Sequence, residues 1–219
     1  MKDFTVADMH RLIGHDYGTI LEIGCNEADD TVDFVARMPH ATFHCFEPDP
    51  RAIAKFKAKN LPANVHLYEV ALSDKIGMAD FHQSDGQPDG ECWKDYGPHW
   101  DKSGSLLLND LHTRHTPWMS FLPPIQVQTT TLDAWANEKL PADTTIDMAW
   151  VDVQGAEALV LKGGQSTIKR LRFFFGECDP RRLYHGMAKI QDLDDLLVGF
   201  KRKLIEYRGF NFLWENTQL

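Results

Sequence analysis

The chain has 219 residues with a formal net charge of −9, and this acidity provides no field that would draw it to nucleic acid or to an anionic membrane. No stretch approaches the roughly 20 apolar residues of a membrane span, and the N-terminus lacks the apolar segment of a signal peptide. Four cysteines show no C-x-x-C spacing, so we expect a reduced, cytoplasmic protein, with homo-oligomerisation left open.

The first predicted elements form a strand, a turn and a helix. Val6–Ile13 is typical of a short helix, and the apolar residues of Thr19–Ile23 predict a strand buried on both faces. Gly24 permits a tight turn, and the small and acidic residues of Asn26–Asp30 favour the start of a helix over Thr31–Met38. A strand, a glycine turn and a helix start in this order indicate a mononucleotide-binding loop.

The second predicted strand supports this interpretation. It covers Thr42–Glu47 and is stopped by Pro48 and Pro50. An acidic residue about 20 positions after the first glycine is where such a unit binds the ribose hydroxyls. Gly24 and Glu47 have this spacing, so we expect Glu47 to bind a ribose.

The charges near the turn favour one adenosine ligand over another. A dinucleotide site needs G-x-G-x-x-G, but the frame here reads Gly24, Asn26 and Asp29. Carboxylates at Glu27, Asp29 and Asp30 would repel a pyrophosphate, whereas S-adenosylmethionine (SAM) has no phosphate and carries a sulfonium and an ammonium group. The pattern favours SAM, and the alternative is that these acids only cap a helix.

The remaining elements alternate in type and indicate an α/β fold. In chain order we expect helix Pro50–Asn60, strand Val65–Leu72, a short strand Met78–Gln83, a β-rich run Ile125–Leu132, a helix from Asp133, strand Ile146–Val153, helix Gly155–Lys162, strand Leu171–Asp179, helix Ile190–Phe200, and strands Leu204–Arg208 and Asn211–Glu215. The last two are too close for a helical crossover and must form an antiparallel hairpin. We therefore predict one domain over residues 1–219 with a Rossmann-like, seven-stranded, mostly parallel sheet, helices on both faces and a C-terminal hairpin, a layout similar to class I methyltransferases.

One segment, Ser84–Pro124, has no sustained helical or strand period. A structureless run of this length within a domain is usually functional or a wrong assignment. Its side chains Trp93, Tyr96, His99 and Trp100 suit a wall that stacks on a sugar or ring. We interpret residues 84–124 as an acceptor-binding insert, and the alternative is that these aromatic side chains only cover the sheet edge.

Three separated segments together resemble the FkbM-type SAM-dependent methyltransferases. They are LEIGCNEADD (21–30), CFEPDP (45–50) followed by VALSD (70–74), and WVDVQGAE (150–157). Their order and spacing agree with that family over roughly residues 19–179. Three positions depart from the family pattern: Glu22 replaces an aspartate, Ala28 a glycine and Trp150 a lysine.

The resemblance implies O-methylation of a saccharide or small natural-product acceptor by SAM, with S-adenosylhomocysteine (SAH) as the product. The expected cofactor-binding residues are Glu22, Gly24, Asn26, Glu47, Pro48, Ala71, Leu72 and Asp152. Two rival hypotheses remain, a nicotinamide-binding oxidoreductase and a non-catalytic module that binds SAM.

The acceptor side needs a base and positioning groups, because an alcohol must lose its proton as the methyl group arrives. Asp152, at the end of a buried strand, is the leading catalytic candidate, unless it only caps the following helix. His99 is the second candidate, because histidine is tuned to neutral pH. The expected substrate-binding residues are Trp100, Ser103, Ser105, Gln154 and Glu177, and no metal site is expected.

Overall fold

The computed structural model describes residues 4–88, 99–109, 111–203 and 210–219. Its main sheet has seven strands in the order β11-β12-β10-β9-β1-β2-β3. They are β1 Tyr17–Ile23, β2 His40–Phe46, β3 Val65–Tyr68, β9 Ile146–Val151, β10 Leu171–Glu177, β11 Phe200–Lys203 and β12 Asn211–Asn216. Five strands are parallel, while β12 pairs antiparallel with β10 and β11 antiparallel with β12. The predicted seven-stranded sheet with its antiparallel C-terminal strands is confirmed.

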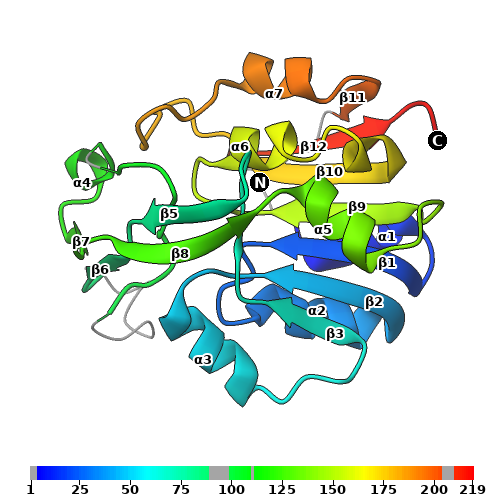
Figure 1. The fold of residues 1–219 in the computed structure, drawn as a ribbon, viewed down its shortest axis with the longest axis horizontal. Helices are drawn as coiled ribbons and strands as arrows, with labels where there is room; N and C mark the ends of the chain where they lie inside the picture. The colour runs from blue at the N-terminus through cyan, green and yellow to red at the C-terminus, as the bar shows by residue number, and fades with distance from the viewer. Residues whose placement is uncertain (1–3, 89–98, 110, 204–209) are drawn as a thin grey trace.

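Helices cover both faces of this sheet, as predicted (Figure 1). One face carries α1 Val6–Ile13, α2 Asp29–Arg37 and α3 Pro50–Ala58; the other carries α5 Leu132–Lys139, α6 Glu157–Lys162, the 3-10 helix η2 Thr167–Arg170 and α7 Ile190–Leu196. Side chains alternate along a strand, so Ile20 joins the cluster that contains Phe34 of α2, and Leu21 joins the cluster that contains Trp135 of α5. No helix among the described residues is long and apolar enough to cross a membrane.

Two smaller sheets lie beside the main one, to its left in Figure 1. Strands β4 Ala71–Leu72, β8 Ile125–Thr130 and β5 Gly77–Phe81 form the first; β6 Ser84–Gly86 and β7 Met119–Phe121 form the second, near the short helix α4 His112–His115. The prediction of one strand over Val65–Leu72 is therefore wrong. The chain turns after Tyr68, whose carbonyl accepts hydrogen bonds from the backbone N–H groups of Val70 and Glu47, and β4 then pairs with β8.

The C-terminal region differs from its prediction in detail. Helix α7 ends at Leu196 rather than at Phe200, because Gly199 adopts a φ of 89° and Phe200 begins β11. Phe200 pairs with Asn216 across the hairpin. The predicted strand Leu204–Arg208 lies outside the described residues, and the strand that pairs with β12 precedes it in the chain.

Candidate active site

A cavity of about 230 Å³ lies at the carboxyl ends of β1, β2 and β9. In parallel α/β sheets this edge is where ligands bind. The cavity brings together all eight residues expected to bind a cofactor: Glu22, Gly24, Asn26, Glu47, Pro48, Ala71, Leu72 and Asp152. Their convergence makes this the candidate cofactor site, called the first cavity below.

Gly24 allows the ends of β1 and β9 to approach each other. Its φ is 85°, and a Cβ built there would lie 1.9 Å from the carbonyl oxygen of Asp152. Only glycine accepts both the left-handed conformation and this contact. Asn26 and Ala28 also have positive φ values, of 44° and 69°. The loop after β1 is therefore bent sharply, which points its backbone towards the first cavity.

Glu47, which directly follows β2, is buried at the first cavity. Its two carboxylate oxygens accept hydrogen bonds from the backbone N–H groups of Asn26 at 2.9 Å and Asp49 at 2.8 Å. Burial raises the pKa of Glu47 to about 7, although these hydrogen bonds favour the ionised form. Each oxygen retains a lone pair, so Glu47 can accept further hydrogen bonds from a ligand.

Glu22 of β1 also lines the first cavity. It is 2% exposed, and its Oε2 accepts a 2.6 Å hydrogen bond from the hydroxyl of Thr31. Burial raises its pKa to about 8, so the carboxyl group is mainly neutral at pH 7. Glu22 therefore adds little negative charge to the first cavity.

Asp152 follows β9 and lies where two cavities meet. The Asp152 side chain is accessible from the two cavities, but protein atoms surround it on all sides of them. This surrounding protein keeps bulk water away and raises the pKa of the Asp152 carboxyl group. The side-chain amide of Gln154 donates to its Oδ1 at 2.6 Å. Asp152 does not cap α6, because the N-cap residue is Ala156 and no side chain caps that helix. The alternative role considered for Asp152 is therefore not found.

A second cavity, of about 340 Å³, continues from Asp152 and Gln154. Four of the five residues expected to bind substrate line it: Trp100, Ser103, Gln154 and Glu177. The fifth, Ser105, is buried beside it, where its hydroxyl donates to the backbone carbonyl of Gln154 at 2.8 Å. Ser105 thus supports the loop after β9 rather than lining the cavity.

Two acids from the end of β10 behave differently in the second cavity. Asp179 is buried and paired with Arg181. Within the described residues, the Glu177 carboxylate makes no hydrogen bond or ion pair. Burial, and then the nearby charge of Asp152, raises the pKa of Glu177 to about 7. Glu177 can therefore exchange a proton near neutral pH.

His99, the histidine predicted to be catalytic, does not lie beside Asp152. His99 is 76% exposed, contacts Asp85 at 3.0 Å and lines neither cavity that contains Asp152. His112 lines the second cavity, and burial lowers its pKa. Trp93 and Tyr96 lie outside the described residues. Among the residues that the structure describes, no three His, Cys, Asp or Glu side chains are grouped to hold a metal ion.

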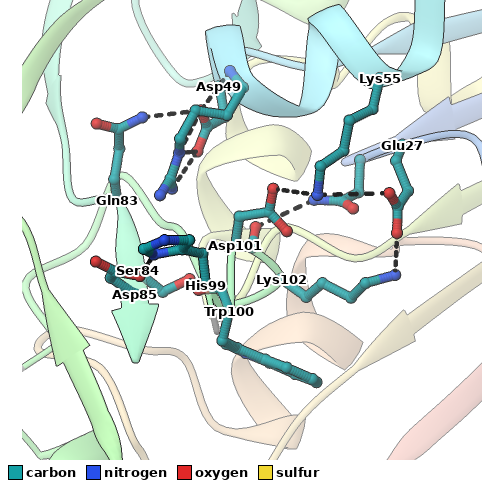
Figure 2. A network of polar contacts seen from close by, with 12 residues as sticks. Glu27, Asp49, Lys55, Gln83, Ser84, Asp85, His99, Trp100, Asp101 and Lys102 are labelled. Atoms are coloured by element: carbon teal, nitrogen blue, oxygen red, sulfur yellow. Dashed lines mark hydrogen bonds and ion pairs between the residues drawn. The ribbon is translucent and has the colours of Figure 1, made fainter. Parts of the chain in front are cut away.

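Three charged residues near the first cavity were missed by sequence reasoning. Figure 2 shows the Lys55 ammonium group between the carboxylates of Asp101, at 2.7 Å, and Glu27, at 3.5 Å. Lys102 contacts Glu27 at 2.7 Å and Asp29 at 3.1 Å. Glu27 and Asp29 of the loop after β1 are therefore already paired with lysines. The sequence around Lys55 carries no recognisable motif, and Asp101 and Lys102 fall in a segment without a periodic pattern.

Tyr184 was also missed. Its hydroxyl donates to Gln154 Oε1 at 2.7 Å and contacts the backbone carbonyl of Ser103 at 3.2 Å. Its ring lies against Gly155, where an added Cβ would be 2.9 Å away. No sequence spacing connects this tyrosine to the loop after β9.

Known proteins resemble this chain over most of its length. The methyltransferase FkbM domain profile matches residues 16–212. The chain is 38% identical over 203 residues to the 2-O-methyltransferase NoeI of Sinorhizobium fredii. The matched region covers 91% of this chain and 80% of NoeI. Among solved structures, a precorrin-6y C5,15-methyltransferase from Geobacter metallireducens is 12% identical, with a TM-score of 0.47 over 95% of this chain and 86% of its own. An rRNA methylase from Streptococcus thermophilus is 10% identical, with a TM-score of 0.44 over 95% of this chain and 92% of its own.

Proposed function

This chain belongs to the FkbM family of methyltransferases, and we propose that it uses SAM to methylate a hydroxyl group of a saccharide or small natural product. The observation that carries the proposal is the meeting of two cavities at Asp152 and Gln154. A methyl donor in one and an acceptor in the other would face each other there. The relative named as a 2-O-methyltransferase supports oxygen as the methylated atom.

The first cavity fits SAM in its chemistry. Glu47 retains lone pairs for the ribose hydroxyls, and Phe46, Val70 and Leu72 provide apolar surface for the adenine. The loop at Gly24 and Asn26 would hold the methionine part. The side-chain oxygen of Asn26 is buried without a hydrogen-bond partner among the described residues. When bound, SAM supplies a methyl group on a positively charged sulfur.

The second cavity fits a neutral acceptor rich in hydroxyl groups. Trp100 offers an apolar surface on which a sugar ring can stack, and Glu177 offers hydrogen-bond acceptors. The cations Lys102 and Arg181 are already paired with carboxylates of the protein. An anionic acceptor would therefore find no uncompensated positive charge on these two residues. We propose that the insert over residues 84–124 helps to choose the acceptor, since it supplies Trp100 and Ser103.

The residues at the junction suggest how the reaction proceeds. Gln154 and Asp152 would orient the acceptor hydroxyl in line with the methyl group, and this positioning accounts for much of the rate in a displacement reaction. As the new C–O bond forms and the C–S bond breaks, Glu177 would take the hydroxyl proton. His99 lies on neither cavity, so we assign no step to it.

Isothermal titration with SAH, with NAD as the control, is the first test of this function. Micromolar binding of SAH without binding of NAD supports the cofactor assignment, and the reverse would indicate an oxidoreductase. Radiolabelled methyl transfer from SAM to a panel of neutral saccharides then tests the reaction. Binding of SAH without transfer to any acceptor would favour the non-catalytic module.

A further inference from the structure

One short segment forms part of the wall of both cavities. Residues 100–106, called the strap, contribute Asp101, Lys102, Gly104 and Leu106 to the first cavity and Trp100, Lys102 and Ser103 to the second. Displacement of the strap would therefore open both sites. The contacts that hold it in place are relevant to cofactor binding as well as to acceptor binding.

On the acceptor side, neutral hydrogen bonds hold the strap. The hydroxyl of Ser84 donates to the backbone carbonyl of Trp100 at 3.0 Å and accepts from the backbone N–H of Ser103 at 3.0 Å. Ser105 reaches the loop after β9 through the backbone carbonyl of Gln154. Screening by salt affects such neutral bonds little.

On the cofactor side, charges hold the strap. Lys55 of α3 reaches Asp101 at 2.7 Å and Glu27 at 3.5 Å, and Lys102 reaches Glu27 at 2.7 Å (Figure 2). The side-chain amide of Asn26 also donates to the backbone carbonyl of Asp101 at 3.1 Å. This network therefore joins the strap to the loop after β1 and to α3.

Burial distinguishes this network from ordinary surface ion pairs, which contribute little to stability. The Asp101 side chain is 6% exposed and that of Lys102 is 24% exposed, so Lys55, which is itself 46% exposed, pairs with a buried carboxylate. By contrast, Lys57 on the same helix pairs with Glu69 while both side chains are more than half exposed. Burial alone would lower the pKa of Lys55, but Asp101 and Glu27 raise it above its ordinary value, so the lysine stays charged.

We propose that Lys55 is a positioning residue for the cofactor: its ion pairs with Asp101 and Glu27 hold the strap across the first cavity and thereby set the affinity for SAM. The inference rests on the proposed function of that cavity. Lys55 does not itself line the first cavity. A change at Lys55 therefore acts on cofactor affinity through the strap and the loop after β1.

Titration of SAH into Lys55→Met, with Lys57→Met as the matched control, tests the proposal. We expect Lys55→Met to weaken SAH binding about tenfold, which corresponds to about 1.4 kcal/mol, and Lys57→Met to bind as the wild type does. Lys55→Arg, which keeps the charge, should restore most of the affinity. Equal affinity in Lys55→Met and the wild type would overturn the proposal, and so would an equal loss in Lys57→Met.

A salt titration of the unaltered protein keeps the proposal testable if Lys55→Met fails to fold. SAH has no net charge at neutral pH, so the salt dependence of its binding reports mainly on charges within the protein. We expect its affinity to fall between low and high sodium chloride; an affinity independent of salt would then overturn the proposal. Failure of the wild type to bind SAH in any salt would instead reject the proposed function itself.

Discussion

The backbone N–H of Asn26 donates a 2.9 Å hydrogen bond to the carboxylate of Glu47, which joins the loop after β1 to the end of β2. The second oxygen of Glu47 accepts the N–H of Asp49. The residue expected to bind the ribose thus also organises the loop that would contact the methionine part. Cofactor binding and loop structure depend on the same side chain.

Replacement of Glu47 should therefore affect two measurements. Glu47→Ala is expected to weaken SAH binding by about 1.5 to 3 kcal/mol, the range for a hydrogen bond to a charged group. It should also lower the free energy of unfolding, because the N–H groups of Asn26 and Asp49 lose their acceptor. Titration calorimetry and denaturant unfolding measure these effects separately. Unchanged SAH affinity would remove Glu47 from the site.

Asp152 should matter more for turnover than for stability. Its carboxylate faces both cavities and caps no helix, so Asp152→Asn removes a charge at the reacting centre with little loss of packing. We expect turnover to fall about a hundredfold or more, the range for a lost acid–base or orienting group. Steady-state kinetics with a thermal melt as the control measures both. Normal turnover would exclude Asp152 from the chemistry.

The pH dependence of the reaction tests Glu177. A base must be ionised to accept a proton, and the pKa of Glu177 is raised to about 7, so kcat/KM should increase as pH rises through 7. Asp152, Asp179 and Arg181 also act on this carboxylate, and His112 and Lys102 line the same cavity. Glu177→Gln should remove the rising limb while SAH affinity is kept. A rising limb that survives in this variant would assign the proton to another group.

Stability should depend on pH through Glu22. The folded-state pKa of Glu22, about 8, lies above the ordinary 4.5, so the folded protein favours the neutral acid. The free energy of unfolding therefore falls as pH rises from 4.5 to about 8. Glu22→Gln stays neutral at every pH. We expect it to gain up to about 5 kcal/mol over the wild type at pH 9, the value of a shift from 4.5 to about 8, and little at pH 5, as thermal melts at the two pH values measure. Equal melting curves at pH 9 would contradict the raised pKa.

Gly24→Ala tests the close approach of β1 and β9. The added methyl group would meet the carbonyl oxygen of Asp152 in a left-handed conformation, so we expect a loss of about 2 to 3 kcal/mol in unfolding free energy. Gly14→Ala is the matched control, because Gly14 has a similar φ of 82° and no atom within 4 Å of the added carbon. It should lose only the conformational part, about 1 kcal/mol. Equal losses in the two variants would show that the contact with Asp152 is relieved.

The sequence predicted the main sheet well because its strands carry strong local signals. Ile146–Val151 is buried at every position, and Gly24 and Pro48 mark where β1 and β2 end. Since the carboxyl ends of parallel strands share one edge, the residues that follow those strands can be grouped into one site from their order in the chain. The expected cofactor residues that follow β1, β2 and β9 line the first cavity for this reason, whereas Ala71 and Leu72 reach it from β4.

The contacts that support the two cavities were harder to predict because they join residues far apart in the chain. Lys55 and Asp101 are 46 positions apart, and Tyr184 reaches Gln154 from 30 positions away. The break after Tyr68 was missed because Val65–Leu72 has the composition of one strand, while the pairing partner of Ala71 and Leu72 is Thr129–Thr130, far along the chain. Local periodicity carries no information about such pairings.

The chain between β4 and β8 contributes no strand to the seven-stranded sheet in its described residues. Neither of the two main core clusters includes any of the described residues between 73 and 124. Phe81 and Leu106 instead pack in a small cluster of their own with Val127. Substitutions and length changes in this excursion, outside the strap, can therefore accumulate without re-registering the sheet, so that relatives could evolve new acceptor preferences, or be engineered to have them, on an unchanged cofactor-binding framework.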